Sequence, residues 1–119
     1  MQFSLTTDES GHYVCDLADG REQRTITASN VPEAGDDLLG AIDDARAEGF
    51  GESLWYEPGG MYRWMLRRSG ERLTVAVMWS DSPVIGYQHA FRGECEFQWF
   101  ADTVRDAVSR LSPRKSIPD

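Results

Sequence analysis

Short runs of alternating apolar and polar residues fill the first thirty positions of the chain. QFSLTT, HYVCDL and QRTITAS are such runs, and the turn-forming clusters DESG and ADGRE separate them. Alternation with a period of two residues is typical of a half-buried strand. The pattern therefore predicts a three-stranded antiparallel meander at the N-terminus.

Two longer segments repeat their apolar residues with the 3.6-residue period of an amphipathic helix. The first helix is predicted over about 32–48, where Pro32 marks the start and Gly49 the end. The second is predicted over about 96–111 and is followed by a proline, which cannot continue a helix. Residues 112–119 are then expected to form a flexible C-terminal tail.

Four further strands are predicted between the two helices, at about 52–57, 61–68, 71–79 and 85–92. The sequences PGG, SG and DSP lie between them and are typical of turns and loops. We therefore predict a single α+β domain over 1–111. It has an antiparallel sheet of about six to seven strands with two helices packed on one face, in the order βββ-α-ββββ-α.

Strand pairing predicts which aromatic residues belong to the core. A two-residue turn at 69–70 places Trp64 opposite Val75, and a turn in PGG places Trp55 opposite Tyr62. Both pairs fall on the same face of the sheet. We therefore expect Trp55, Tyr62 and Trp64 to be core aromatics beneath the helices.

The opposite face of these strands combines methionines, a tyrosine and arginines, and we call it the Met/Arg face. It consists of Leu54, Tyr56, Met61, Arg63, Met65, Arg67, Arg72, Thr74, Ala76 and Met78. Solvated sheet faces usually carry Thr, Lys and Glu, whereas this composition is typical of adaptable contact surfaces. The candidate partner-binding residues are Tyr56, Met61, Arg63, Met65 and Arg67. Two other interpretations remain: the meander covers this face, or arginine stems lie over its apolar patches.

The last predicted strand has two possible orientations, set by the length of the loop before it. A four-residue loop directs Ile85, Tyr87, His89 and Phe91 to the Met/Arg face, whereas a five-residue loop directs them to the core. We adopt the five-residue loop. His89 is then expected to be a partly buried, hydrogen-bonded histidine.

The chain of 119 residues has a net charge of −8, and the charge is unevenly distributed. Residues 1–57 hold thirteen acids and three bases, whereas residues 58–119 hold seven acids and nine bases. This balance disfavours nucleic acid, which requires a basic footprint, and indicates a basic partner for the first half. The sequence shows no membrane span and no signal peptide, so we expect a cytoplasmic protein.

The first predicted helix concentrates its acids opposite the apolar stripe. These acids repel one another, and those in the later turns oppose the helix dipole, so helix formation gains little from them. We interpret them as candidate contacts for a basic partner, with a solvated face as the alternative. Trp99, on the polar side of the last helix, is a candidate interface anchor unless it packs under a loop. The acids are Asp36, Asp37, Asp43, Asp44 and Glu48.

The usual catalytic and metal-binding patterns are missing from the sequence. It contains no GxSxG, P-loop, GxGxxG or HExxH motif. Cys15 and Cys95 lie outside any CxxC or Cys/His cluster and are expected to be buried thiols. The sequence therefore predicts no enzymatic activity, no cofactor and no metal.

The order of elements, with the hairpin LWYEPGGMYRW and the closing helix EFQWFADTVRDAVSRL, resembles that of small bacterial immunity-like proteins of polymorphic-toxin systems. The resemblance implies an inhibitor that binds and occludes a toxin inside the cell that makes it. An acidic inhibitor suits a basic toxin, because complementary charge raises the association rate.

Two other functions remain open at the level of the sequence. A small-ligand-binding domain would line a pocket between sheet and helices with Trp55, Tyr62, Trp64, Trp79 and Tyr87. A homo-oligomeric structural subunit would instead use the Met/Arg face as its interface. The sequence is compatible with a monomer or a homodimer.

Overall fold

The computed structural model describes residues 1–82, 84 and 86–111, and it contains two antiparallel sheets and two helices. The first sheet has the order β1-β2-β3 and the second the order β4-β5-β6-β7. The predicted tail at 112–119 lies outside the described residues. The elements are β1 (Gln2–Thr7), β2 (Tyr13–Asp19), β3 (Glu22–Ala28), α1 (Glu33–Glu48), β4 (Phe50–Glu57), β5 (Gly60–Ser69), β6 (Arg72–Ser82), β7 (Gly86–Glu96) and α2 (Phe97–Leu111).

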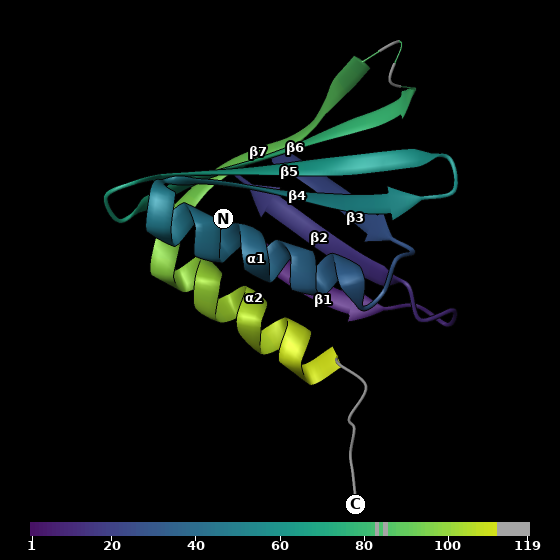
Figure 1. The fold of residues 1–119 in the computed structure, drawn as a ribbon, viewed down its shortest axis with the longest axis horizontal. Helices are drawn as coiled ribbons and strands as arrows, with labels where there is room; N and C mark the ends of the chain where they lie inside the picture. The colour runs from purple at the N-terminus through teal and green to yellow at the C-terminus, as the bar shows by residue number, and fades with distance from the viewer. Residues whose placement is uncertain (83, 85, 112–119) are drawn as a thin grey trace, which may run out of the picture.

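The predicted element order is confirmed, but the single sheet of six to seven strands is wrong. The chain leaves β3 for α1, and α1 runs so close to β4 that a Cβ added at Gly51 would lie 2.0 Å from the Ala41 carbonyl oxygen. The helix therefore packs over the core face of β4, and its Asp37 accepts a hydrogen bond from the Leu54 N–H at the edge where another strand would pair. In Figure 1, α1 and α2 lie side by side across the two sheets.

The core lies where the two sheets face each other and the helices close the gap. Tyr13 of β2 packs against Trp55 of β4, with 5.7 Å between ring centroids, and Trp55 packs against Trp64 of β5 at 5.0 Å. All three side chains are fully buried, which confirms that Trp55 and Trp64 are core aromatics, whereas Tyr62 is only half-buried and packs against the core. Cys15 and Cys95 are also buried, as predicted.

Two hairpins show how turn position sets the register. Trp55 pairs with Tyr62, as predicted, but Trp64 pairs with Val77 rather than Val75. The second turn lies one residue later than predicted, with Ser69 opposite Arg72. A shift of two residues keeps every side chain on its own face. The face assignment therefore holds although the register does not.

The predicted orientation of β7 is correct for only part of the strand. Val77 pairs with Phe91 whereas Met78 pairs with His89, so Ala90 is an extra residue in a β-bulge. Phe91 is buried, as expected, but Tyr87 and His89 are exposed and not directed to the core. The bulge reverses the alternation, which a fixed loop length does not predict. Ile85 lies outside the described residues.

Candidate functional site

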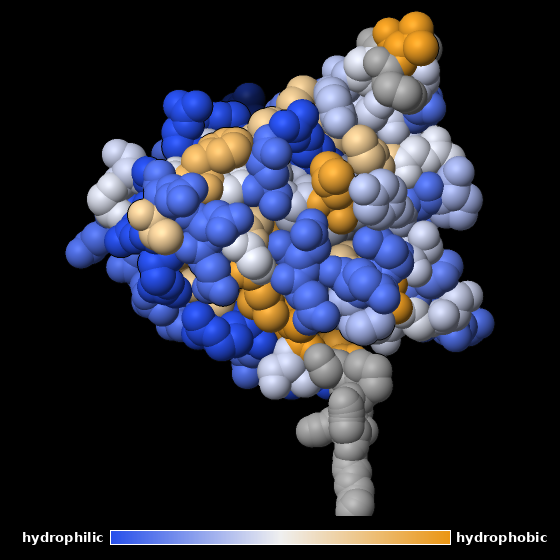
Figure 2. All heavy atoms as spheres, in the orientation of Figure 1, coloured by the Kyte–Doolittle hydropathy of each residue, from blue (hydrophilic) through white to orange (hydrophobic). Residues whose placement is uncertain are grey.

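The outward side of α1 is an acidic surface built from two rows of carboxylates. Asp36 and Asp43 form one row, and Glu33, Asp37, Asp44 and Glu48 form the other, since residues at these spacings share a helix face. All six acids are exposed. Gly40 and Ala47, also exposed, lie between the rows. We call this surface the acidic α1 face. Figure 2 shows that most of the side chains on the side of the molecule that carries α1 and α2 are hydrophilic.

Among the described residues, the acids of α1 lack the basic partners that several acids of other elements have. In the part of the chain that the structure describes, no ion pair includes an acid of α1. Glu52, Glu94, Asp102 and Asp106, by contrast, each pair with an arginine. The negative charge of the acidic α1 face is therefore left uncompensated by the fold.

The single base of α1 is turned away from its acids. Arg46 donates a hydrogen bond to Gln98 of α2 at 3.3 Å, and its guanidinium lies 4.9 Å from the centroid of the Phe97 ring. Arg68 lies over the same ring at 4.6 Å and donates to the Arg46 carbonyl oxygen. These contacts hold Arg46 at the junction of the helices, so it does not neutralise the acidic α1 face.

Asp37 has a structural role that the sequence did not indicate. Its Oδ2 accepts hydrogen bonds from the Ser53 hydroxyl and the Leu54 backbone N–H, both at 2.8 Å. The Asn30 side chain similarly accepts from the Tyr56 N–H at 3.0 Å. These groups occupy the free edge of β4 and attach α1 to it. Of the acids predicted to bind a partner, Asp37 is thus already engaged within the chain.

The Met/Arg face forms the outer surface of the four-stranded sheet, on the side away from the core. Three rows run across its four strands: Phe50, Arg67, Thr74 and Glu94; Glu52, Met65, Ala76 and Arg92; and Leu54, Arg63, Met78 and His89. Tyr56 and Met61 continue the pattern at the far end. Alternate residues of the same strands, such as Trp64 and Val77, are fully buried, whereas those of this face are half-buried or exposed. The N-terminal meander packs against the other side and leaves the Met/Arg face open, except at its edge, where Glu22 contacts His89.

Two hollows lie on the Met/Arg face. One, of about 290 Å³, is lined by Phe50, Met65, Arg67, Thr74, Ala76 and Arg92. The other, of about 370 Å³, lies near the β6–β7 hairpin and includes Tyr56, Met61, Asp81 and Tyr87. Phe50, Tyr56 and Tyr87 are exposed by 43%, 47% and 39%, which is high for large apolar side chains on one surface. Of the predicted residues, Met65 and Arg67 line the first hollow, and Tyr56 and Met61 line the second.

Arg63 lies between the two hollows and is held by its neighbours. It forms an ion pair with Glu52, which raises the pKa of the Arg63 guanidinium, and it lies 5.5 Å from the centroid of the Tyr87 ring. The aromatics expected to surround a ligand do not share one space. Tyr87 lies on this outer face, whereas Trp55 and Trp64 pack together in the core.

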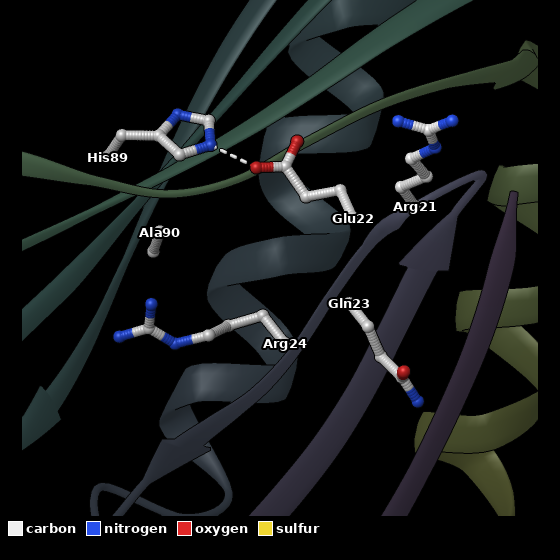
Figure 3. A pocket seen from close by; sticks show the side chains of 6 residues that line it. All are labelled: Arg21, Glu22, Gln23, Arg24, His89 and Ala90. Atoms are coloured by element: carbon white, nitrogen blue, oxygen red, sulfur yellow. Dashed lines mark hydrogen bonds and ion pairs between the residues drawn. The ribbon is translucent and has the colours of Figure 1, made fainter.

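A third feature is a shallow cleft of about 600 Å³ where the first sheet meets β7. Figure 3 shows its lining residues, in which the His89 ring points toward the Glu22 carboxylate. Glu22 also accepts a hydrogen bond from the Arg92 backbone N–H, and Asp19 accepts one from the Glu94 N–H at 2.7 Å. The hydrogen bond from His89 lowers the pKa of Glu22, as do the contacts with Arg92. The two acids thus join the β2–β3 turn to the outer edge of β7.

Trp99 does not extend freely into solvent. It lies in the first turn of α2, is half-buried and packs against the hydrophobic core. This position agrees better with the alternative prediction, in which the Trp99 ring packs against other parts of the protein and is not free in solvent. Its role as an interface anchor stays a prediction.

The structure identifies residues that sequence analysis did not select. Asp19 and Glu22 lie in ADGRE, which was interpreted only as a turn, and their contacts with β7 span more than sixty residues of sequence. Within residues 1–82, 84 and 86–111, no three His, Cys, Asp or Glu side chains gather as metal ligands, and no helix is long and apolar enough to cross a membrane. Comparisons with family models, curated proteins and solved structures found no match to this chain.

Proposed function

We propose that this protein is a non-enzymatic binding domain, similar in role to immunity proteins, that occludes a basic protein partner with its acidic α1 face. The observation that carries the proposal is the uncompensated charge of α1. Asp36, Asp43, Asp44 and Glu48 are exposed, and none is in an ion pair among the described residues. Carboxylates that no base of their own chain neutralises are available to a basic partner.

The shape of the surface supports the same proposal. Gly40 and Ala47 separate the two acidic rows with small side chains, and a Cβ added at Gly40 would meet nothing within 4 Å. Packing inside the protein therefore does not require glycine at position 40, although glycine weakens a helix. A flat strip between two rows of carboxylates allows a partner backbone to approach closely while its lysines or arginines reach the acids on each side.

The proposal divides the acids of α1 into two groups. Asp43, Asp44 and Glu48 have no hydrogen bond to a side chain or backbone outside the helix in the described part of the chain. Asp37 is bound to Ser53 and Leu54. We therefore assign partner contact to Asp43, Asp44 and Glu48, with Asp36 beside them, and fold stability to Asp37.

The test is a pull-down from lysate of the source cell with three forms of the tagged protein. These are the wild type, the charge-reversed variant Asp43→Lys/Asp44→Lys/Glu48→Lys, and the control variant Glu9→Lys/Glu71→Lys/Glu96→Lys. The control makes the same change in net charge at exposed acids outside α1. A basic protein retained by the wild type and the control, but lost with the α1 variant or at high salt, is the expected result.

Association kinetics with the captured protein then measure the mechanism. Loss of complementary charge is expected to slow association by about tenfold or more at low salt and to change dissociation less. A partner that binds the α1 variant as fast as the wild type would remove the acidic α1 face from the proposed function. Equal loss with both variants would show a dependence on total charge alone.

A further inference from the structure

We propose that the Met/Arg face is a homodimer interface, in which two copies pack face to face around a twofold axis parallel to the strands. This inference is independent of the proposed function, because it concerns the opposite side of the four-stranded sheet from α1. It rests on the exposed apolar side chains of the face, on its balance of charge and on the order of residues within its rows.

The charge of this face differs from that of the whole protein. The three rows that cross the sheet contain three arginines and only two acids. The arginines are Arg63, Arg67 and Arg92, and the acids are Glu52 and Glu94. Two copies of a chain with a net charge of −8 repel each other in general. The Met/Arg face is a region where arginines offset the acids, so two copies meet there with little electrostatic cost.

The residue order makes the face complementary to itself. In an isologous interface, the twofold axis brings the same surface of both copies together. An axis that runs parallel to the strands, between β5 and β6, therefore places β4 of one copy over β7 of the other and β5 over β6. In the row Glu52, Met65, Ala76 and Arg92, Glu52 then faces Arg92 of the second copy, and Met65 faces Ala76. The twofold axis forms this Glu52–Arg92 contact twice, and Glu52 also lies in an ion pair with Arg63 of its own chain.

The outer positions of the other rows contain no second complementary pair, because Phe50 then faces Glu94 and Leu54 faces His89. At the end of the sheet, Tyr56 of β4 faces Tyr87 of β7, which brings the two exposed tyrosines of each copy into contact. Arg67 faces Thr74, beside Glu94. An axis perpendicular to the strands would instead place Arg92 opposite His89 and Met65 opposite Arg63. The Glu52–Arg92 pair therefore favours the parallel axis, and aligned packing is a common arrangement of two sheets.

The available area sets the expected strength. Four strands about 4.8 Å apart and seven residues of about 3.4 Å each give a face of roughly 20 by 24 Å. Two such faces bury about 1,000 Å² in total, near the lower limit for a specific interface. We therefore expect a dimer that dissociates on dilution.

Sedimentation velocity over a wide range of protein concentration tests the dimer. In an Arg63→Met background, which removes the partner of Glu52 within its own chain, Glu52→Arg and Arg92→Glu are each expected to weaken dimerisation by about tenfold. Glu52→Arg/Arg92→Glu in the same background should restore it to near the level of Arg63→Met alone, because the pair is rebuilt in reverse. Glu9→Arg and Arg105→Glu are the controls, since they change net charge equally at exposed positions away from the face. Thermal unfolding verifies that each variant is folded.

The sign of the Glu52→Arg effect separates a specific pair from general repulsion. This variant makes the chain less negative, so a dimer limited only by repulsion would become tighter, whereas loss of the Glu–Arg contact makes it weaker. A wild-type protein that is monomeric at every concentration overturns the proposal. A dimer that is insensitive to both single variants, or that the double variant fails to restore, overturns this arrangement.

Chemical crosslinking gives an independent readout of the axis. Glu52→Cys and Arg92→Cys lie on opposite edges of the sheet, so a bismaleimide that spans about 10 Å, the usual separation of packed sheets, joins them only between copies. A mixture of the two single variants is expected to crosslink, and Glu52→Cys alone is not. The native thiols interfere little, because both are buried and burial raises the pKa of Cys95 to about 11. Efficient crosslinking of Glu52→Cys to itself would contradict the parallel axis.

Discussion

Two glycines of α1 show how a single position is decided by what surrounds it. A Cβ added at Gly35 would lie 2.6 Å from the Tyr13 hydroxyl oxygen, whereas one added at Gly40 would meet no atom within 4 Å. Both lie in the same helix, five residues apart. Gly35 is therefore explained by packing against Tyr13, and Gly40 is not explained by any contact within the described chain.

The two glycines should respond in opposite ways to alanine. Gly40→Ala is expected to raise the free energy of unfolding by about 0.5–1 kcal/mol, because alanine loses less backbone entropy in a helix. Gly35→Ala is expected to lower it, because the added methyl group overlaps the Tyr13 hydroxyl. Urea denaturation of the two variants measures the difference.

Tyr13→Phe provides the matched background for this comparison. It removes the atom nearest to the added methyl group, so Gly35→Ala should cost less in the Tyr13→Phe protein than in the wild type. Equal stabilisation by Gly35→Ala and Gly40→Ala in the wild type would show that the Gly35–Tyr13 contact does not constrain the helix.

At the scale of elements, the main feature is how the four-stranded sheet ends. Its outer strands are β4 and β7, and side chains from other elements accept hydrogen bonds from the N–H groups on both outer edges. Asp37 and Asn30 accept hydrogen bonds from N–H groups of β4, and Asp19 and Glu22 accept them from N–H groups of β7. Each outer strand is thus attached to a neighbouring element by carboxylate or amide oxygens and not by another strand.

Asp37 should therefore matter more for stability than the acids beside it on α1. Asp37→Ala is expected to lower the free energy of unfolding by about 1–2 kcal/mol, since it leaves the Leu54 N–H and the Ser53 hydroxyl without their acceptor. Asp37→Asn keeps one acceptor oxygen and should cost less. Asp44→Ala is the control and should change stability by no more than about 0.5 kcal/mol. Chemical denaturation that finds Asp37→Ala and Asp44→Ala equal would refute this role.

Sequence periodicity predicted the elements better than it predicted their assembly. Trp55 and Trp64 were assigned to the core because alternation along a strand is local, and a register error of two residues does not change it. The bulge at Ala90 and the separation into two sheets depend on contacts between distant segments. Asp37 was assigned to partner binding because a helix pattern shows which side an acid lies on but not which strand edge lies beside it.

At the scale of the whole molecule, the two sheets are joined beside β7 by the hydrogen bond between the His89 ring and the Glu22 carboxylate. The pKa of Glu22 is lowered from its ordinary value of 4.5, chiefly by this hydrogen bond. A carboxyl group whose pKa is lower in the folded protein stabilises the fold above its unfolded-state pKa. This contribution is lost as the pH falls through the folded-state pKa.

Glu22→Gln should therefore lower Tm at pH 6 but have progressively less effect as the pH falls below 4.5, where the wild-type carboxylate also becomes protonated. Differential scanning calorimetry of the two proteins over this range measures the convergence. Glu9→Gln, at an exposed acid in the β1–β2 loop, is the control. A Tm difference for Glu22→Gln that stays constant down to the lowest pH would show that the carboxylate charge is not the cause.

The occupied edges of the four-stranded sheet also limit how other polypeptides can bind. An extended peptide that joins a sheet by β-augmentation needs a free row of N–H and C=O groups, and such rows also start amyloid growth. Here a new strand beside β4 would have to displace Asp37 and Asn30, and one beside β7 would have to displace Asp19 and Glu22. Recognition by this sheet is therefore expected to involve its side chains and not its backbone, and the same carboxylates should protect the protein against aggregation at high concentration.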